Sequence, residues 1–418
     1  MPATEMTAPV EASLQELDKL GIAYKDVEKP DSVESLQSVM ERASREGLKV
    51  LPLGGGTSLG AANLPQRVDI VLDMTKMDKV IHFDPKNLNL NVQAGLNIQA
   101  VNQYLAEQDR GFFLPLDPLL SERATIGGAY ASNSSGPWRQ FYGSVRDLTL
   151  GAGALDAGGH EVKFGGVTVK NVSGYDLTKF FIGSAGSLCL ITRVSFRILP
   201  LPDAFSACEV LLKDEEQAAQ LLSDVRSSVL VPSALVAVRE KKSPDVRIIA
   251  GFEGHPRAVE RQNRELSKIG EGYGGSSQVE MGRQKLQAKI GQAFNPDLSA
   301  EKTAIFKVSV PISKGAQTLG SIRQKANDQG LEAKLVLLAG NGVLYVHLDY
   351  ADEAALSPFV EFVKDAARKQ QGHAVPIQAP YSVLSSWGQR GDSVIDRHVL
   401  QPIKNTFDPA GILLPLNA

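Results

Sequence analysis

The sequence predicts an α+β protein that is divided into more than one domain. The chain has 418 residues, whereas one domain usually has roughly 150. Over the second half of the chain, short apolar runs alternate with runs rich in Gln, Ala, Glu and Lys, which indicates strands and helices around one sheet. Two prolines within residues 199–202 favour an exposed connector, so we place a domain boundary there.

The first part of the chain begins with two predicted helices. Leucines at helical spacing predict a short amphipathic helix within residues 1–25, and we treat residues 1–29 as an N-terminal helical extension. The second helix begins at Asp31, which forms an acidic capping pair with Glu34, and ends at Gly47. The apolar run LKVLPL predicts a strand that leads into a glycine-rich turn.

A hairpin and a third helix follow. Residues 84–87 predict a turn, and apolar residues alternate with polar ones over residues 88–93, as in a strand with one buried face. A helix is expected from about Ile98 to Gln108. Between residues 120 and 198, short strands are expected between two clusters rich in glycine and serine.

The second part of the chain predicts several strands of one sheet. They fall at the runs CEVLLK, SALVAVRE, VRIIAGFEG, AIFKVSVP and GVLYVHLDY. Residues 254–283 predict a polar helix followed by a glycine-serine loop. A final helix is expected from about Asp396, before the terminal run FDPAGILLP.

Composition and charge exclude several classes of function. With 43% hydrophobic and 22% charged residues, the chain has the composition of an ordinary globular protein. Its 44 basic and 47 acidic residues give a net charge of −3, and they form no basic cluster that could follow a phosphate backbone. Nucleic acid is therefore not an expected partner. Glycine is enriched in a few loops, which favours binding by the main chain.

The cysteines and the hydropathy favour a cytoplasmic protein. Cys189 and Cys208 lie in apolar runs, so we expect two buried free thiols in a reducing compartment, with a disulfide or a metal pair as the alternative. The N-terminal residues have no apolar stretch typical of a secretory signal, and no run has the roughly 18 apolar residues that cross a bilayer. Association with a membrane is expected only through partners.

The first glycine cluster is LPLGGGTSLG, directly after a predicted strand. Gly54, Gly55 and Gly56 have no Cβ and permit positive φ, so successive amides can converge on an anion, and Thr57 and Ser58 add hydroxyl donors. A diphosphate fits, because it accepts several hydrogen bonds from donors that lie close together. The motif is neither a Walker A sequence nor G-x-G-x-x-G, and a plain tight turn is the alternative.

Two further clusters could bring the main chain against a ligand. The second is TIGG, residues 125–128, with the SG and YG pairs downstream, and a close crossing of a helix and a strand is its alternative. The third comprises KNVSGYDL, residues 170–177, and GSAGSL, residues 183–188, before an apolar strand. Asp176 could equally well cap the helix that starts at Leu177.

Taken together, these clusters resemble one family of flavoproteins. GGGTSLG, TIGG, KNVSGYDLTKFFIGSAGSL and the terminal FDPAGILLP occur in the order found in the group that includes vanillyl-alcohol oxidase, D-lactate dehydrogenase and glycolate oxidase. The runs SGPWRQFYGSVRDL and FGGVTVKNVSGYDLTKFFIGSAG are most similar to the smaller FAD-binding subunit of bacterial glycolate oxidases. The resemblance is strong over residues 30–200, fair over 385–418 and weak between them.

This resemblance implies a PCMH-type FAD-binding domain of two subdomains over residues 30–200. An α+β cap domain over residues 201–384 and a C-terminal segment, 385–418, that returns to the FAD-binding domain complete the expected fold. Carried over by position, the residues implied to bind FAD are Leu53, Gly54, Gly55, Gly56, Thr57, Ser58, Leu59, Thr125, Gly127, Gly128, Asn133, Gly136, Tyr142, Gly143, Asn171, Gly174, Tyr175, Asp176, Gly183, Gly186, Ser187 and Ile191.

The chain departs from this family pattern at several points. Many relatives attach the flavin to a histidine in these clusters, but the chain has its histidines elsewhere, so we expect non-covalent FAD; they are His82, His160, His255, His347, His373 and His398. The metal-binding run of related dehydrogenases, with its pair of histidines, has only His347 here, so no metal is expected and His347 is more typical of a structural residue. Ala185 and Leu414 replace the Glu and Asn of many relatives.

Three functions follow from the resemblance. The first is an FAD-binding subunit of a 2-hydroxy-acid dehydrogenase, which works with a catalytic flavoprotein subunit and an iron–sulfur subunit. The second is a self-sufficient FAD-dependent enzyme that oxidises a small 2-hydroxy acid or an alcohol, for which substrate roles could fall to His347, His373, Arg390 and Arg397. The third is a scaffold subunit that keeps the fold without catalysis.

Overall fold

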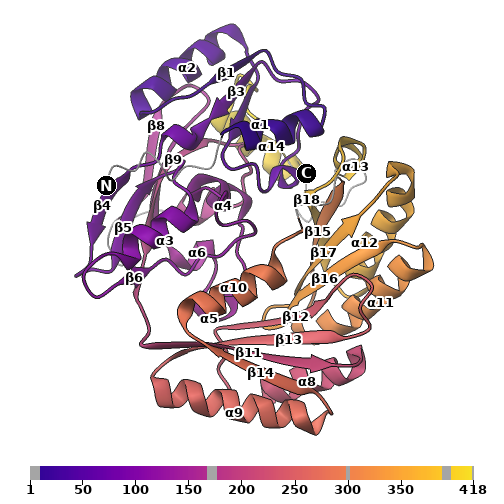
Figure 1. Ribbon diagram of the computed structural model, residues 1–418. Helices are drawn as coiled ribbons and strands as arrows, with labels where there is room; N and C mark the ends of the chain where they lie inside the picture. The colour runs from indigo at the N-terminus through magenta and orange to yellow at the C-terminus, as the bar shows by residue number, and fades with distance from the viewer. Residues whose placement is uncertain (1–9, 167–176, 298–301, 388–396, 417–418) are drawn as a thin grey trace. The chain divides into compact units, whose positions relative to one another are not determined.

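The computed structural model of the protein describes residues 10–166, 177–297, 302–387 and 397–416. The chain divides into two compact units, whose helices and strands are labelled in Figure 1. Unit 1 contains residues 1–135, 143–201 and 380–418, and unit 2 contains residues 136–142 and 202–379. The chain therefore enters unit 2 twice. The first and shorter of these two segments, residues 136–142, is called the strap.

The described residues of unit 1 form three sheets. A three-stranded parallel sheet has the order β1-β3-β2, a five-stranded antiparallel sheet has the order β4-β5-β9-β7-β8, and β6 pairs with β10. The strands are β1 Asp26–Glu28, β2 Val50–Leu53, β3 Ile70–Asp73, β4 Val80–Asp84, β5 Asn89–Gln93, β6 Phe112–Phe113, β7 Thr149–Leu155, β8 Glu161–Gly165, β9 Leu190–Arg197 and β10 Leu199–Pro200. The helices are α1 Val10–Lys19, α2 Val33–Glu46, α3 Ile98–Ala106, α4 Ile126–Ser132, α6 Val145–Leu148, α7 Leu177–Phe180, α13 Tyr381–Trp387 and α14 Arg397–Phe407.

Helix α2 shows how the local sequence builds this unit. Leu36, Met40 and Ala43 recur at helical spacing and are buried in the core beside the parallel sheet. The helix ends, as predicted, at Gly47, whose φ of 67° is left-handed. The predicted acidic cap is wrong, because a capping box of Ser32 with Ser35 satisfies the first amides instead.

The predicted hairpin and the strand after it are confirmed. The Asp84 carboxylate accepts hydrogen bonds from the amides of Lys86 and Asn87, which closes the turn between β4 and β5. Leu90 and Val92 on β5 are fully buried in the second core of unit 1, where β9 pairs with β5. The alternation in the sequence therefore marks the buried face of the sheet.

Unit 2 is built on one antiparallel sheet of eight strands, in the order β14-β11-β13-β12-β16-β17-β15-β18. The strands are β11 Ala204–Leu212, β12 Ala234–Arg239, β13 Val246–Gly254, β14 Ser276–Met281, β15 Thr303–Ser309, β16 Glu332–Leu338, β17 Val343–Asp349 and β18 His373–Gln378. The helices are α5 Arg139–Tyr142 in the strap, α8 Glu215–Ser227, α9 Pro256–Gly272, α10 Arg283–Phe294, α11 Gly315–Asp328 and α12 Leu356–Lys369. All five predicted runs are strands, whereas the predicted glycine-serine loop contains the edge strand β14.

Different helices pack against the two faces of this sheet. Leu337 on β16 lies against the start of α11, since a Cβ on Gly315 would be 2.8 Å from its side chain. The opposite face carries Tyr345, whose ring packs edge-on against Phe294 of α10. Residues directly opposite each other on antiparallel strands share a face, so the register assigns every strand position to one side or the other.

Candidate cofactor-binding site

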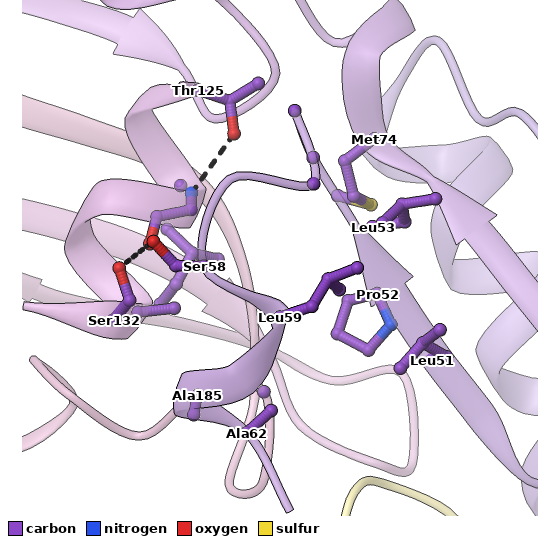
Figure 2. Close-up of a pocket in the computed structure, with 18 of the residues that line it drawn as sticks. Leu51, Pro52, Leu53, Ser58, Leu59, Ala62, Met74, Thr125, Ser132 and Ala185 are labelled. Atoms are coloured by element: carbon purple, nitrogen blue, oxygen red, sulfur yellow. Dashed lines mark hydrogen bonds between the residues drawn. The ribbon is translucent and has the colours of Figure 1, made fainter. Parts of the chain in front are cut away.

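A pocket lies in unit 1 at the end of β2, with a cavity volume of about 120 Å³ and a mouth open to solvent (Figure 2). The walls come from β2 and the glycine loop after it, from α4, from the turn before β9 and from the C-terminal segment at Leu414. None of the described residues that line the pocket is charged, so a ligand there meets the main chain, hydroxyl groups and apolar side chains.

The first glycine loop is shaped by close packing more than by positive φ. A Cβ on Gly54 would be 2.3 Å from the Thr125 hydroxyl oxygen, and one on Gly55 would be 1.8 Å from the Arg123 carbonyl oxygen. Of the three glycines, only Gly56 has a positive φ, of 68°. Gly56 alone of the three uses the freedom of positive φ, whereas Gly54 and Gly55 are glycine because another loop lies against them.

The amides of this loop are available to a ligand. The structure gives the N–H groups of residues 55–58 no acceptor among the described residues, although the loop is enclosed by its neighbours. The Ser58 hydroxyl of the same loop lies 3.4 Å from that of Ser134. Neutral donors close together at the end of a strand fit a diphosphate, which is the group that joins the two halves of FAD.

The second cluster has a different role. Gly127 donates its amide to the Ala94 carbonyl at 2.7 Å, and the Gly128 amide bonds to the Thr125 hydroxyl, which caps α4. A Cβ on Gly127 would be 2.8 Å from that of Ala94. The close helix–strand crossing given above as the alternative is present, and the same small residues line the pocket.

Behind the glycine loop lie residues that sequence reasoning missed. Arg123 donates from Nη2 to the Gly55 carbonyl at 3.3 Å and lies 3.9 Å from the Glu16 carboxylate. Ser13 of α1 is buried, and its Cα is 3.3 Å from the position of a Cβ on Gly56. The N-terminal helix is thus a support for the loop. No local sequence signal marks this, because the contacts join segments more than 40 residues apart.

A second missed residue is Lys404 on α14. Its buried ammonium donates to the carbonyls of Ser187 at 2.7 Å and Leu414 at 2.9 Å, and it pairs with the Asp408 carboxylate at 2.5 Å. Asp408 in turn accepts from the amides of Ile412 and Leu413. Burial lowers the pKa of Lys404, and Asp408 acts against that shift. Lys404 therefore joins two segments that both line the pocket.

The structure brings twelve of the predicted residues together around the pocket. They are Leu53, Gly54, Gly55, Gly56, Thr57, Ser58, Leu59, Thr125, Gly127, Gly128, Gly186 and Ile191. Lining residues that were not predicted are mostly apolar or small, such as Met74, Ala94, Ala131 and Leu190. The Ala185 and Leu414 positions, noted above as departures from the family pattern, also line it.

Six predicted residues lie elsewhere than in the pocket wall. Asn133, with a φ of 50°, ends α4, Gly143 lies against Asp147, Gly183 donates its amide to Tyr130, and the Ser187 hydroxyl donates to Ser184. Gly136 and Tyr142 belong to the strap of unit 2, where the Tyr142 hydroxyl donates to Glu253 at 2.6 Å. The remaining four, Asn171, Gly174, Tyr175 and Asp176, lie outside the described residues.

The cysteines and histidines of the described residues do not form a metal site near the pocket. Cys189 lines the pocket as a free thiol whose pKa is raised by burial, and Cys208 is also free and buried. His347 is buried in unit 2, and burial, followed by Lys334 and Lys241, lowers its pKa to about 3. Across the described ranges, no three His, Cys, Asp or Glu side chains are grouped as a metal site. No helix in the same ranges is both long and apolar enough to cross a membrane.

Comparison with protein families matches both parts of the chain. Residues 25–165 match the FAD binding domain family, and residues 196–376 match the family described as FAD linked oxidases, C-terminal domain. Glycolate oxidase subunit GlcD of Bacillus subtilis is 30% identical over 206 residues, which are 49% of this chain and 43% of that protein. D-lactate dehydrogenase of Archaeoglobus fulgidus is 27% identical over 93% of this chain and 90% of its own length. The chain thus spans under half of the first relative and nearly all of the second.

Solved structures share the fold at low sequence identity. Alkyldihydroxyacetonephosphate synthase aligns with a TM-score of 0.70 and 19% identity over 94% of this chain and 76% of its own. Glucooligosaccharide oxidase from Acremonium strictum aligns with a TM-score of 0.70 and 14% identity over 97% of this chain and 95% of its own, and its FAD is described as 6-S-cysteinyl and 8α-N1-histidyl. The described residues that line the pocket here include a cysteine but no histidine.

Proposed function

The chain belongs to the FAD-linked oxidases, with a PCMH-type FAD-binding domain in an α+β fold, and from this we propose that it is the FAD-binding subunit of a 2-hydroxy-acid dehydrogenase of the glycolate-oxidase type. The observation that carries the proposal is the uncharged pocket with unbonded amides at residues 55–58. The relatives named for glycolate and D-lactate support the class of substrate.

Residues of unit 1 would hold FAD without a covalent bond. The amides of residues 55–58 and the Ser58 hydroxyl would receive the diphosphate, and the small residues of α4 would let the cofactor lie close to the main chain. Lys404 would keep the Gly186 turn and the Leu414 segment in place on the other wall. When bound, FAD supplies a two-electron acceptor for oxidation of the hydroxyl group.

The partners belong to the same proposal. We assign the chain to a complex with a catalytic flavoprotein subunit and an iron–sulfur subunit that accepts the electrons. In support, the relative in Bacillus subtilis is itself named as a subunit, and the described residues contain no metal-binding group of their own. The two free cysteines support a cytoplasmic setting, with contact to a membrane only through partners.

A self-sufficient enzyme is the second candidate, favoured by the match along 90% of the archaeal D-lactate dehydrogenase. The deciding experiment purifies the chain alone, records the flavin absorbance, and adds glycolate or D-lactate with a dye acceptor. If the flavin bleaches only after the partner subunits are added, the result supports the proposal that the chain is a subunit. Rapid bleaching without partners identifies the self-sufficient enzyme. If the purified chain is colourless and cannot be reconstituted with FAD, the remaining function is that of a scaffold subunit without catalysis.

A further inference from the structure

A group of basic side chains on one face of the sheet in unit 2 has no acidic partner. Lys307 lies on β15 opposite Tyr345 of β17, so it shares the face of the sheet that carries α10 and not the face covered by α11. Lys307 is half-buried, and the structure gives its ammonium no hydrogen bond or ion pair among the described residues. A half-buried cation without a counter-ion is costly, which points to an absent ligand.

His373 is placed beside Lys307 by the register of the edge strand. Lys307 is opposite Val375 and Ser309 is opposite His373, so the two basic residues are diagonal neighbours on one face. Diagonal positions are within reach of long side chains. Partial burial and then the charge of Lys307 lower the pKa of His373, which agrees with their proximity.

Arg139 comes to the same face from the strap. Tyr142 of the strap bonds to Glu253, and Gln140 donates to the Pro232 carbonyl at 2.7 Å, so the strap is fixed to the sheet on both sides of Phe141. Burial first, and then the charge of Arg139, lower the pKa of Lys307 to about 8. Arg139 and Lys307 repel each other, and the hydrogen bonds of Gln140 and Tyr142 hold the strap, and with it Arg139, near Lys307.

The acidic residues that the register places on this face, which include Glu209, Glu253 and Asp349, already have partners. The Glu253 carboxylate accepts one hydrogen bond from Tyr142 at 2.6 Å and one from Ser233 at 2.6 Å. Its charge is therefore used within the strap contact and does not pair with Lys307. The face therefore offers donors and positive charge to a small anion, while the carboxylates of Glu253, Glu209 and Asp349 are bound to other side chains.

We propose that Lys307, Arg139 and His373 form an anion site in unit 2 that binds the carboxylate of a small 2-hydroxy acid. The choice of acid rests on the proposed function, whereas the need for an anion rests on the cluster itself. A planar carboxylate suits the arrangement, because Arg139 can donate two parallel hydrogen bonds while Lys307 supplies a point charge. Glycolate is the smallest 2-hydroxy acid, and oxalate is a dicarboxylate of similar size that cannot be oxidised as an alcohol, so both serve as probes of the carboxylate site.

The test measures binding to the FAD-loaded full chain by titration calorimetry, without turnover. Oxalate and glycolate should bind about 10- to 100-fold more weakly to Lys307→Met than to the unchanged chain, as expected for loss of a charged hydrogen bond. Lys307→Arg should keep most of the affinity. Lys369→Met, which removes an exposed lysine at the end of α12, is the matched control and should bind both probes normally. If Lys307→Met does not fold, Lys307→Gln replaces it.

Two outcomes overturn the anion site. One is unchanged oxalate affinity in Lys307→Met, and the other is equally tight binding of ethylene glycol, which has no carboxylate, or of sulfate, which is an anion of another class. The result is separate from the proposed activity. Loss of oxalate affinity in Lys307→Met, in a chain that oxidises no hydroxy acid with or without partners, would sustain the anion site and refute the dehydrogenase function.

Discussion

The pocket of unit 1 and the basic face of unit 2 use opposite means to attract a ligand. The pocket has no charged residue in its described lining and offers main-chain amides and small side chains. The basic face offers Arg139, Lys307 and His373 without an acidic partner. Amides fixed by backbone packing suit a resident cofactor that stays bound, whereas long cationic side chains suit a small substrate that must enter and leave.

The comparison predicts that the largest effect in unit 1 comes from the buried ion pair of Lys404 with Asp408. Lys404→Met leaves the Asp408 carboxylate buried without its cation, and we expect a loss of about 3–5 kcal/mol in the free energy of unfolding. Denaturant titration with and without FAD measures it. The double variant Lys404→Met with Asp408→Asn should recover part of the loss. Full stability of the single variant would show that this contact does not hold the pocket wall.

The next effect tests the role of the backbone. Gly55→Val places a side chain where the Arg123 carbonyl lies, so the loop must move and FAD should bind at least about 100-fold more weakly. FAD retained after gel filtration is the measurement. Gly272→Val is the control, because nothing lies within 4 Å of a Cβ at that exposed position on α9. A normal flavin spectrum in Gly55→Val would remove this loop from the site.

His347 predicts a pH effect in unit 2. Its folded pKa of about 3 lies below the ordinary value of 6.5, so the unfolded chain takes up a proton first and stability falls as the pH drops from 6.5 toward 3. Both ring nitrogens are buried without a partner. His347→Phe should remove this dependence and raise the free energy of unfolding at pH 5 by about 2 kcal/mol relative to the unchanged chain. Parallel pH profiles of the two chains would contradict it.

The smallest effect tests whether the two regions are independent. Tyr142→Phe removes one of the two donors to Glu253 and should lower the free energy of unfolding by about 1–2 kcal/mol. The FAD content should not change, because the Tyr142 contact lies within unit 2. Thermal unfolding and flavin absorbance on one sample measure both. Loss of FAD in this variant would mean that the strap supports the pocket.

Sequence reasoning found the parts of the site whose signal is local. Three consecutive glycines after an apolar strand predict a loop that offers its amides, and residues 54–58 do line the pocket. The cap of α2 was missed by one residue, because Ser32 and Asp31 are both good N-cap residues and only the backbone decides between them. Arg123 and Lys404 could not be found from sequence, since each bonds to main-chain carbonyls of distant segments.

The basic cluster of unit 2 was found from the sequence only in part. His347 and His373 were candidates for a substrate role, but one is a buried neutral ring and the other is a neighbour of Lys307. Nothing in the sequence distinguishes Lys307 from other lysines, because an unpaired charge becomes visible only when the strands are in register. Arg390 lies outside the described residues.

The strap also limits how this protein can be re-engineered. Because residues 136–142 fold with unit 2 although they follow α4 of unit 1, a chimaera that exchanges only residues 202–379 with a relative would pair a foreign sheet with a native strap. Such a hybrid would lose the match between Tyr142 and Glu253 and would inherit Arg139 without its neighbours. Transfer of substrate preference between relatives therefore requires both segments to be moved together.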